Sequence, residues 1–186
     1  MRAQRHDSYA LSVTDTLILR APTATSRMVV HPSADVPGVP AFVFAAPDGW
    51  VLDEAPGAIC VVRSPERVDD FWLNAVISHD RVARTVDLEQ AARATWARIV
   101  ADSPGATVSM ERIARFGENV VYLRGIQLEA PRSGRPLAQL HALFFAPIAD
   151  GRATSDLFQI IATSPADVMG DIGAGLVEMI ASFQFV

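Results

Sequence analysis

Residues 42–50 read Phe-Val-Phe-Ala-Ala-Pro-Asp-Gly-Trp, a short apolar run followed by a turn and a large aromatic residue. Pro-Asp-Gly is a strong turn signal, and the apolar residues before it favour a strand. The stretch therefore predicts the opening of an antiparallel sheet and the start of the folded domain. It contains no side chain that indicates a particular chemistry.

The chain after this stretch carries the patterns of further strands. Every second residue from Phe71 to Ile77 is apolar and shares one face, which indicates a strand with one well-packed side. The later apolar segments are separated by short turns, each with a glycine at a position that needs positive φ. Such turns predict successive antiparallel hairpins. The expected strands are Ile59–Arg63, Phe71–His79, Thr107–Phe116, Val120–Glu129, Leu137–Pro147 and Ala153–Thr163.

A helix is expected between the second and third of these strands. Asp87 can accept a hydrogen bond from the amide of Gln90 while the Gln90 side chain reaches back, which is the signature of a capping box. Apolar residues then recur at spacings of three and four as far as Val100, so one stripe of the helix should lie on the sheet.

A second helix is expected at the C-terminus. Ser164-Pro165-Ala166-Asp167 predicts its start, with a serine cap and a proline in the first turn. We expect its glycines, at positions 170, 173 and 175, to lie where the helix axis comes close to the sheet. The predicted fold class is α+β: an antiparallel meander packed against a mid-chain helix and a C-terminal helix.

Composition excludes several classes of function. The chain has 186 residues, 50% of them hydrophobic, and a formal net charge of −5. This suits one soluble domain and offers no basic stripe for a nucleic-acid backbone. Lysine is absent and arginine supplies every positive side chain, which we attribute to GC-rich codon usage of a bacterial kind. Leu11–Leu19 is interrupted by polar residues, so we expect neither a signal peptide nor a membrane span, and a cytoplasmic location.

The first 36 residues differ from the rest of the chain. They are rich in Ser, Thr, Ala and Pro and end in a string of turn formers. Thr16–Leu19 and Arg27–Val30 nevertheless have the composition of short strands. We predict an arm of residues 1–36, docked on a sheet edge or on a neighbouring chain of a homodimer, and a single α+β domain of residues 37–186.

The sequence contains no recognisable catalytic or metal-binding motif. The four histidines lack metal-ligand spacing, and the single cysteine, Cys60, sits in an apolar run where it resembles a small hydrophobic residue. Ser78-His79-Asp80 cannot act as a triad, because neighbouring side chains of a strand point to opposite faces. We therefore expect no catalytic residue, no metal and no cofactor.

Four residues are candidates for contact with a ligand or partner. Trp72 shares a strand face with polar residues and could lie at the edge of a groove. Arg112 and Arg124 lie in strands of the meander, where they either face solvent or line a groove that holds an anion. His141 lies in mid-strand, where it either lines a pocket or is an ordinary hydrogen-bonded histidine.

Three segments in this order resemble PsbP-like domains, notably LpqN-type lipoproteins. Phe42–Trp50 resembles their opening strand and turn, Asp87–Ala101 their mid-chain helix, and Leu137–His141 through Thr163–Pro165 their last hairpin and the entry to the C-terminal helix. The resemblance covers roughly residues 40–185. It implies the α+β fold and a binding role without a shared catalytic site, as in an extrinsic photosystem subunit, a Ran-binding import factor, effector chaperones and envelope lipoproteins. It does not extend to the lipid-modified cysteine of LpqN-type proteins, or to residues 1–36.

These observations favour a non-enzymatic binding, scaffold or chaperone-like protein that acts through protein–protein contacts. The alternative is a carrier of a small apolar or lipid ligand, held between the sheet and a helix, since both faces of Leu137–Pro147 are apolar. A hydrolase that uses acidic residues or His141 is the third interpretation.

Overall fold

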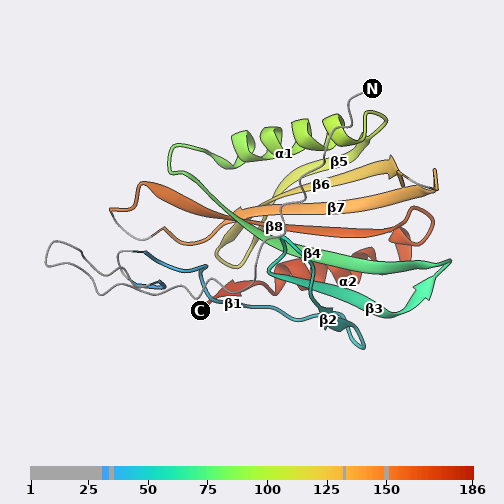
Figure 1. Cartoon of the computed structure of the whole chain (residues 1–186), viewed down its shortest axis with the longest axis horizontal. Helices are drawn as coiled ribbons and strands as arrows, with labels where there is room; N and C mark the ends of the chain where they lie inside the picture. Colours follow the sequence, from blue (N-terminus) through green and yellow to red (C-terminus); the bar gives the residue numbers. More distant parts are fainter. Residues whose placement is uncertain (1–30, 34–35, 132, 149–150) are drawn as a thin grey trace, which may run out of the picture. The chain divides into compact units, whose positions relative to one another are not determined.

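The computed structural model describes residues 31–33, 36–131, 133–148 and 151–186 (Figure 1). The chain divides into two units, Met1–Gly38 and Val39–Val186. In the first unit, the Ser33 amide donates to the Val36 carbonyl oxygen at 2.9 Å, which forms a turn. The strands predicted at 16–19 and 27–30, and the predicted docking of the arm, lie outside the described residues. The helices and strands of the described residues all lie in the second unit.

A seven-stranded antiparallel sheet forms the centre of this unit, in the order β2-β3-β4-β8-β7-β6-β5. Five hairpins link strands that are adjacent in sequence, and β4 pairs with β8 to join the two halves. The predicted α+β fold with a meander is confirmed. The strands are β2 (Val51–Asp53), β3 (Cys60–Val68), β4 (Phe71–Ala83), β5 (Thr107–Phe116), β6 (Asn119–Glu129), β7 (Pro136–Phe145) and β8 (Thr154–Pro165).

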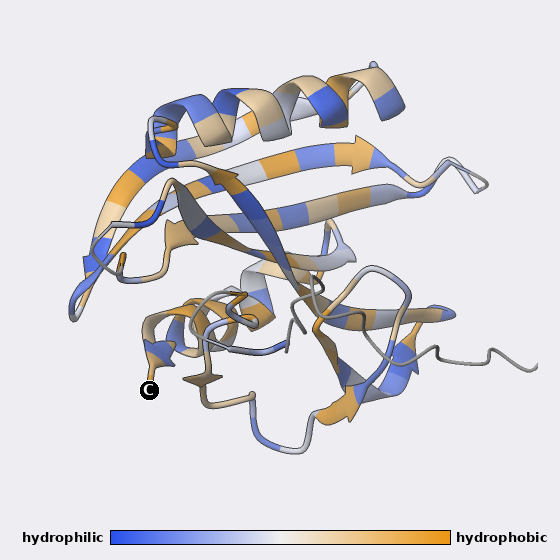
Figure 2. Ribbon diagram, turned by 60° about the vertical axis from the view of Figure 1, so that its left-hand side comes forward, coloured by the Kyte–Doolittle hydropathy of each residue, from blue (hydrophilic) through white to orange (hydrophobic). Residues whose placement is uncertain are grey.

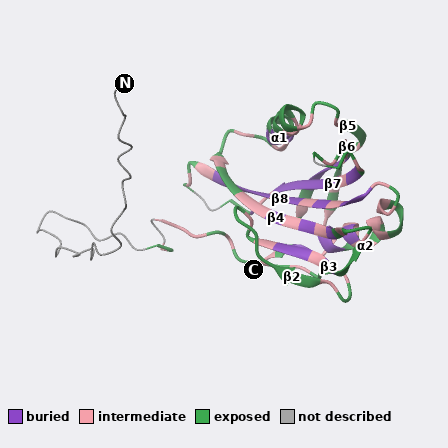
Figure 3. Cartoon of the chain, turned by 45° about the vertical axis from the view of Figure 1, so that its right-hand side comes forward, coloured by how far each residue is buried: buried purple, intermediate pink, exposed green. Residues whose placement is uncertain are grey.

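The two helices cover opposite faces of the sheet (Figure 2). Helix α1 (Leu88–Asp102) contacts β6 and β7, and helix α2 (Met169–Ala181) contacts β7 and β8. Along β7, Leu143 packs on the α1 side and the adjacent Phe144 on the α2 side, as the alternation of strand side chains requires. Burial is concentrated in the central strands, while β2 and β5 at the two edges are largely exposed (Figure 3).

Aromatic rings fill the core on the α2 side. The sequence predicted that the run beginning at Phe42 opens the main sheet, and for strand β1 (Phe42–Val43) this is wrong. Strand β1 pairs instead with β9 (Gln184–Phe185) in a separate two-stranded ribbon. The reason is that the Phe42 ring stacks on Phe183 at a centroid distance of 4.7 Å, which holds residues 42–44 beside the end of α2. The main sheet begins directly after Trp50. The phenylalanine rings that contact one another in this core are Phe42, Phe44, Phe144, Phe158, Phe183 and Phe185.

The predicted start of α1 is confirmed, and that of α2 is wrong. Asp87 and Gln90 form the expected capping box at the start of α1. The cap predicted for α2 is wrong: Pro165 is the last residue of β8 and pairs with Leu137, and Val168 precedes the helix without a side-chain cap. The predicted close approach of the α2 glycines is also wrong, because a Cβ placed on any of the three would meet nothing within 4 Å.

Turn geometry follows the glycines, with one exception. Gly117, Gly134 and Gly151 have the expected positive φ. The β3–β4 turn instead places two aspartates, Asp69 and Asp70, in the left-handed region, with φ of 48° and 63°. Consecutive positive φ values are typical of a type I′ hairpin turn, where Asp-Gly or Asn-Gly is preferred.

Replacing Asp70 by glycine should therefore stabilise the protein by about 0.5–1 kcal/mol, because glycine has no Cβ to strain in this conformation. Asp69 is left unchanged because its carboxylate accepts from Arg135 at 2.9 Å. Asp70→Ala is the control and should destabilise the protein. Chemical denaturation of the three proteins measures both effects, and an Asp70→Gly protein less stable than wild type would contradict the strain argument.

Candidate functional site

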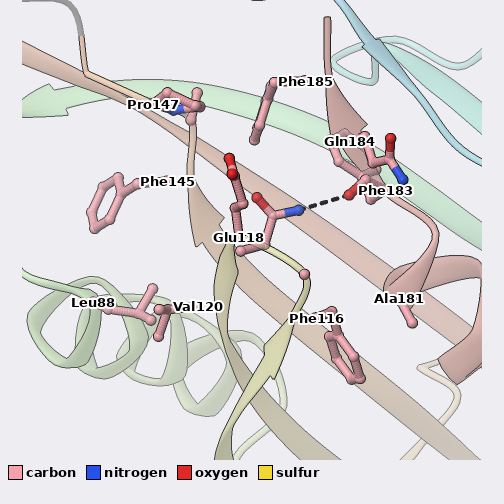
Figure 4. A pocket seen from close by; sticks show the side chains of 13 residues that line it. Leu88, Phe116, Glu118, Val120, Phe145, Pro147, Ala181, Phe183, Gln184 and Phe185 are labelled. Carbon is pink, nitrogen blue, oxygen red and sulfur yellow. Dashed lines mark hydrogen bonds between the residues drawn. The ribbon is translucent and has the colours of Figure 1, made fainter.

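A groove of about 670 Å³ lies at one end of the sheet, where the β5–β6 turn, the end of β7 and the C-terminal segment meet (Figure 4). Its walls are mainly apolar, and it is open to solvent on one side. We call it the Phe groove. Its lining residues are Leu88, Phe116, Gly117, Glu118, Asn119, Val120, Phe145, Ala146, Pro147, Ala181, Phe183, Gln184 and Phe185.

Hydrogen bonds hold the walls of the Phe groove in place. The Asn119 side-chain amide donates to the Phe183 carbonyl oxygen at 2.7 Å and so ties the β5–β6 turn to the end of α2. The Ser182 hydroxyl donates to the Met179 carbonyl oxygen at 2.7 Å and accepts from the Ala45 amide at 2.8 Å. These bonds fix the C-terminal wall before any ligand arrives, which lowers the cost of ordering it on binding.

One charged side chain, that of Glu118, lines the Phe groove. It is exposed, and Figure 4 shows its carboxylate between the Phe145 and Phe185 rings. Glu118 forms no ion pair within the described chain, so its carboxylate is available to a ligand. The groove thus combines aromatic surface with a single negative charge.

Of the four residues singled out from the sequence, Arg124 lies under helix α1, where it is 4% exposed. Its guanidinium donates to Glu111 Oε1 at 2.6 and 3.1 Å, to the Tyr122 hydroxyl at 2.8 Å and to the Ala92 carbonyl oxygen at 3.0 Å. It also lies 5.3 Å from the centre of the Trp96 ring. Because one cation links α1 to two strands, Arg124 fastens the helix to the sheet.

His141 lies opposite Arg124 on the neighbouring strand and is 1% exposed. Its Nε2 is 2.8 Å from Gln139 Oε1, and its Nδ1 is 3.4 Å from Gln159 Nε2. Burial, together with the charge of Arg124, lowers the pKa of His141 to about 4. The ring is therefore neutral at physiological pH and belongs to a buried hydrogen-bonded chain.

Arg112 and Trp72 lie apart from this cluster. Arg112 is exposed on the edge strand β5 and pairs with Leu123 of β6. It therefore lies on the opposite face of the sheet from Arg124. Both arginines nevertheless border a shallow hollow of about 410 Å³. Trp72 is 39% exposed, and Arg67 lies 4.0 Å above its ring centre. The structure does not bring these four residues into one site, and their predicted contact with a ligand or partner stays a prediction.

An imidazole and a carboxylate do meet where β4 ends and β8 begins. Asp156, with a side chain 3% exposed, accepts from His79 Nε2 at 2.9 Å, from Arg81 at 3.1 Å and from Arg152 at 2.8 Å. Burial alone would raise the pKa of Asp156, but these hydrogen bonds and the charge of Arg152 lower it. In the described part of the chain, no hydroxyl or thiol is hydrogen-bonded to His79. The cluster therefore lacks the paired nucleophile and base of a catalytic site, and its hydrogen bonds connect β4 to the start of β8.

The remaining features add no reactive centre to the described part of the chain. No three His, Cys, Asp or Glu side chains within these residues are placed to hold a metal ion. Neither α1 nor α2 has the length and apolar character needed to cross a bilayer, and they are the helices of the described residues.

The sequence does not reveal the Phe groove, because its walls come from four separate parts of the chain. The sequence predicts only a glycine-containing turn between the strands that end at Phe116 and begin at Val120, and it indicates no role for Phe185. A usable signal was present: large aromatic residues stand next to a turn and at the end of the chain, where they are not needed to continue a strand or helix pattern.

Comparison with known proteins identifies the fold. No family model matches the sequence, and no curated protein matches it. LpqN of Mycobacterium tuberculosis, described as involved in cell envelope biogenesis, superposes with a TM-score of 0.66 at 15% identity, over 84% of this chain and 87% of that one. Cyanobacterial PsbP from Synechocystis sp. PCC 6803 gives 0.55 at 16% identity, over 78% and 86%. The Ran-binding protein Mog1p of Saccharomyces cerevisiae gives 0.50 at 14% identity, over 78% and 90%.

At these identities the likeness concerns the fold alone. The chain has a PsbP-like α+β fold, similar to that of LpqN, and the resemblance predicted from the sequence is confirmed at that level.

Proposed function

We propose that this protein is a non-enzymatic binding protein whose Phe groove holds an apolar segment of a protein partner. One observation carries the proposal: within the described residues, a preformed groove of about 670 Å³, walled by aromatic rings, is open to solvent. Apolar concavities of this size are the usual anchor points for a few large side chains of a partner. A cytoplasmic location stays a prediction beside this proposal.

The chemistry of the Phe groove defines the partner segment. Phe116, Phe145 and Phe185 offer ring faces and edges to a large aliphatic or aromatic side chain. The Glu118 carboxylate stands beside them and favours a lysine or arginine next to that side chain. The expected ligand is therefore a polypeptide segment with an apolar anchor flanked by a basic residue.

Two features favour a protein segment over a carried lipid. The Phe groove is open on one side, so it does not enclose a ligand as a carrier must. The hollow between α1 and the sheet, where an apolar ligand was the alternative, has a mostly polar lining that suits an acyl chain poorly. Its polar residues are Ser78, His79, Asp80, Thr95, Arg98, Asp102 and Gln159.

Selection of peptides from a random phage-displayed library on the immobilised protein tests the proposal. We expect enriched peptides to carry an aromatic or large aliphatic residue next to Lys or Arg. Val120→Arg places a bulky cation in the Phe groove, from a position that is 39% exposed, and should weaken the selected peptides at least about tenfold.

Val108→Arg is the matched control, because Val108 is 41% exposed and lies outside the groove. Glu118→Gln should weaken basic peptides about two- to five-fold, and less at high salt, as expected for an exposed ion pair. Peptides that bind Val120→Arg as well as they bind wild type would overturn the proposal. A lipid retained after purification, seen by native mass spectrometry, would favour the carrier instead.

A further inference from the structure

The two edges of the sheet differ in length and exposure. Strand β2 at one edge has three residues, whereas β5 at the other has ten. A long edge strand leaves one row of backbone N–H and C=O groups without a strand partner, which makes it a template for another strand. In the middle of β5, Ile113 is 54% exposed.

We propose that two copies of this chain pair along β5, antiparallel, about a two-fold axis at Ile113. The axis must be perpendicular to the sheet, because only this arrangement makes the two copies of β5 antiparallel neighbours. Each face of one copy then continues the same face of the other. Glu111 pairs with Arg124 and Ile113 with Tyr122 inside the chain, so both lie on the α1 face, as does Arg115.

The charges of β5 select one register. With Ile113 opposite Ile113 of the second copy, Glu111 lies opposite Arg115 of the second copy, and the symmetric pair repeats this contact. On the other face, Met110 lies opposite Phe116. Opposite charges that face each other across two strands are favourable, and like charges are unfavourable.

The neighbouring registers lack this complementarity. An axis at Arg112 would set two arginines directly opposite each other, and an axis at Ala114 would leave Glu111 opposite Gly117 and Arg115 opposite Ile113, without an ion pair. The self-complementary order Glu111, Ile113, Arg115 therefore identifies a second copy of this chain, rather than an arbitrary strand, as the partner that fits the edge.

Disulfide trapping tests the register. Ile113→Cys, made in a Cys60→Ser background, places two cysteines directly opposite each other on the axis, at about 5.5 Å between Cα atoms, within reach of a disulfide. Arg115→Cys in the same background is the control, because its two cysteines would lie four positions apart, about 14 Å. We expect a covalent dimer under mild oxidation for position 113 alone. Dimers from both variants, or from neither, would overturn the proposal.

Sedimentation of the full chain tests the charge argument without a crosslink. We expect a concentration-dependent dimer for wild type, and at least about tenfold weaker dimerisation for Arg115→Glu, which sets two glutamates opposite each other twice. Arg112→Glu changes the net charge equally on the same strand but lies opposite Ala114, and should dimerise like wild type. A wild type that stays monomeric, or equal weakening by both variants, would overturn the proposal.

Discussion

Replacing Phe183 with alanine is expected to lower the free energy of unfolding by about 3–5 kcal/mol, the usual cost of removing a fully buried aromatic side chain. Phe183 is 1% exposed and joins the end of α2 to the β1–β9 ribbon and the sheet. Its ring centroid lies 4.7 Å from that of Phe42, 4.8 Å from that of Phe144 and 5.4 Å from that of Phe185. The substitution removes all of these contacts and leaves a cavity.

Urea denaturation measures this loss, and Phe183→Leu separates packing from simple hydrophobicity. Leucine keeps most of the apolar volume but not the ring contacts, so its cost should be about 1–2 kcal/mol. An alanine variant within about 1 kcal/mol of wild type would mean that the aromatic core does not hold the C-terminal segment as described.

Acid should destabilise the protein through His141, and His141→Gln should remove that part of the pH dependence. The folded state holds the pKa of His141 near 4, against an ordinary value of 6.5, first because the ring is buried and then because Arg124 is close. Between these two pH values the unfolded chain binds a proton that the folded chain does not. Stability from this residue is therefore complete above pH 6.5 and falls as the pH falls towards 4.

The expected loss for wild type is about 2 kcal/mol between about pH 7.5 and about pH 5. Glutamine can still donate and accept hydrogen bonds next to Gln139 but does not titrate. The free energy of unfolding of His141→Gln should therefore fall by about 2 kcal/mol less than that of wild type over the same pH range. Urea denaturation at the two pH values measures the difference. His31→Gln, at an exposed histidine, is the control. Parallel pH profiles for wild type and His141→Gln would show that His141 does not titrate as described.

Local patterns predicted β4 and α1 because one face of each is buried. The alternation from Phe71 to Ile77 matches the burial in β4, and the capping box of α1 forms between residues three positions apart. Such signals depend on neighbours in the sequence, so they can be interpreted without the fold.

Contacts between distant residues account for what the sequence did not reveal. Phe42 pairs with Phe185, and only the completed core shows why residues 42–43 leave the main sheet. Pro165 resembles the first residue of a helix, but the register of β8 on β7 keeps it in a strand. Proline at a strand end is compatible with pairing, so the local signal was ambiguous.

The candidate residues likewise depend on contacts between distant parts of the chain. Arg124 and His141 were chosen because polar groups within strands can face a groove, yet their partners on α1 and neighbouring strands bury both. For the Phe groove the reverse holds: nothing in the sequence distinguishes its aromatic residues, and only the fold places them around an open hollow.

The most direct test of the binding proposal is an NMR titration of the isotope-labelled protein with a peptide obtained by selection. The proposal predicts that backbone amide signals of Gly117, Val120, Ala181 and Gln184, which line the Phe groove, shift with the peptide concentration. Signals around Trp72 and Arg67 should stay in place. Shifts confined to Trp72 and Arg67, with the groove unperturbed, would contradict it.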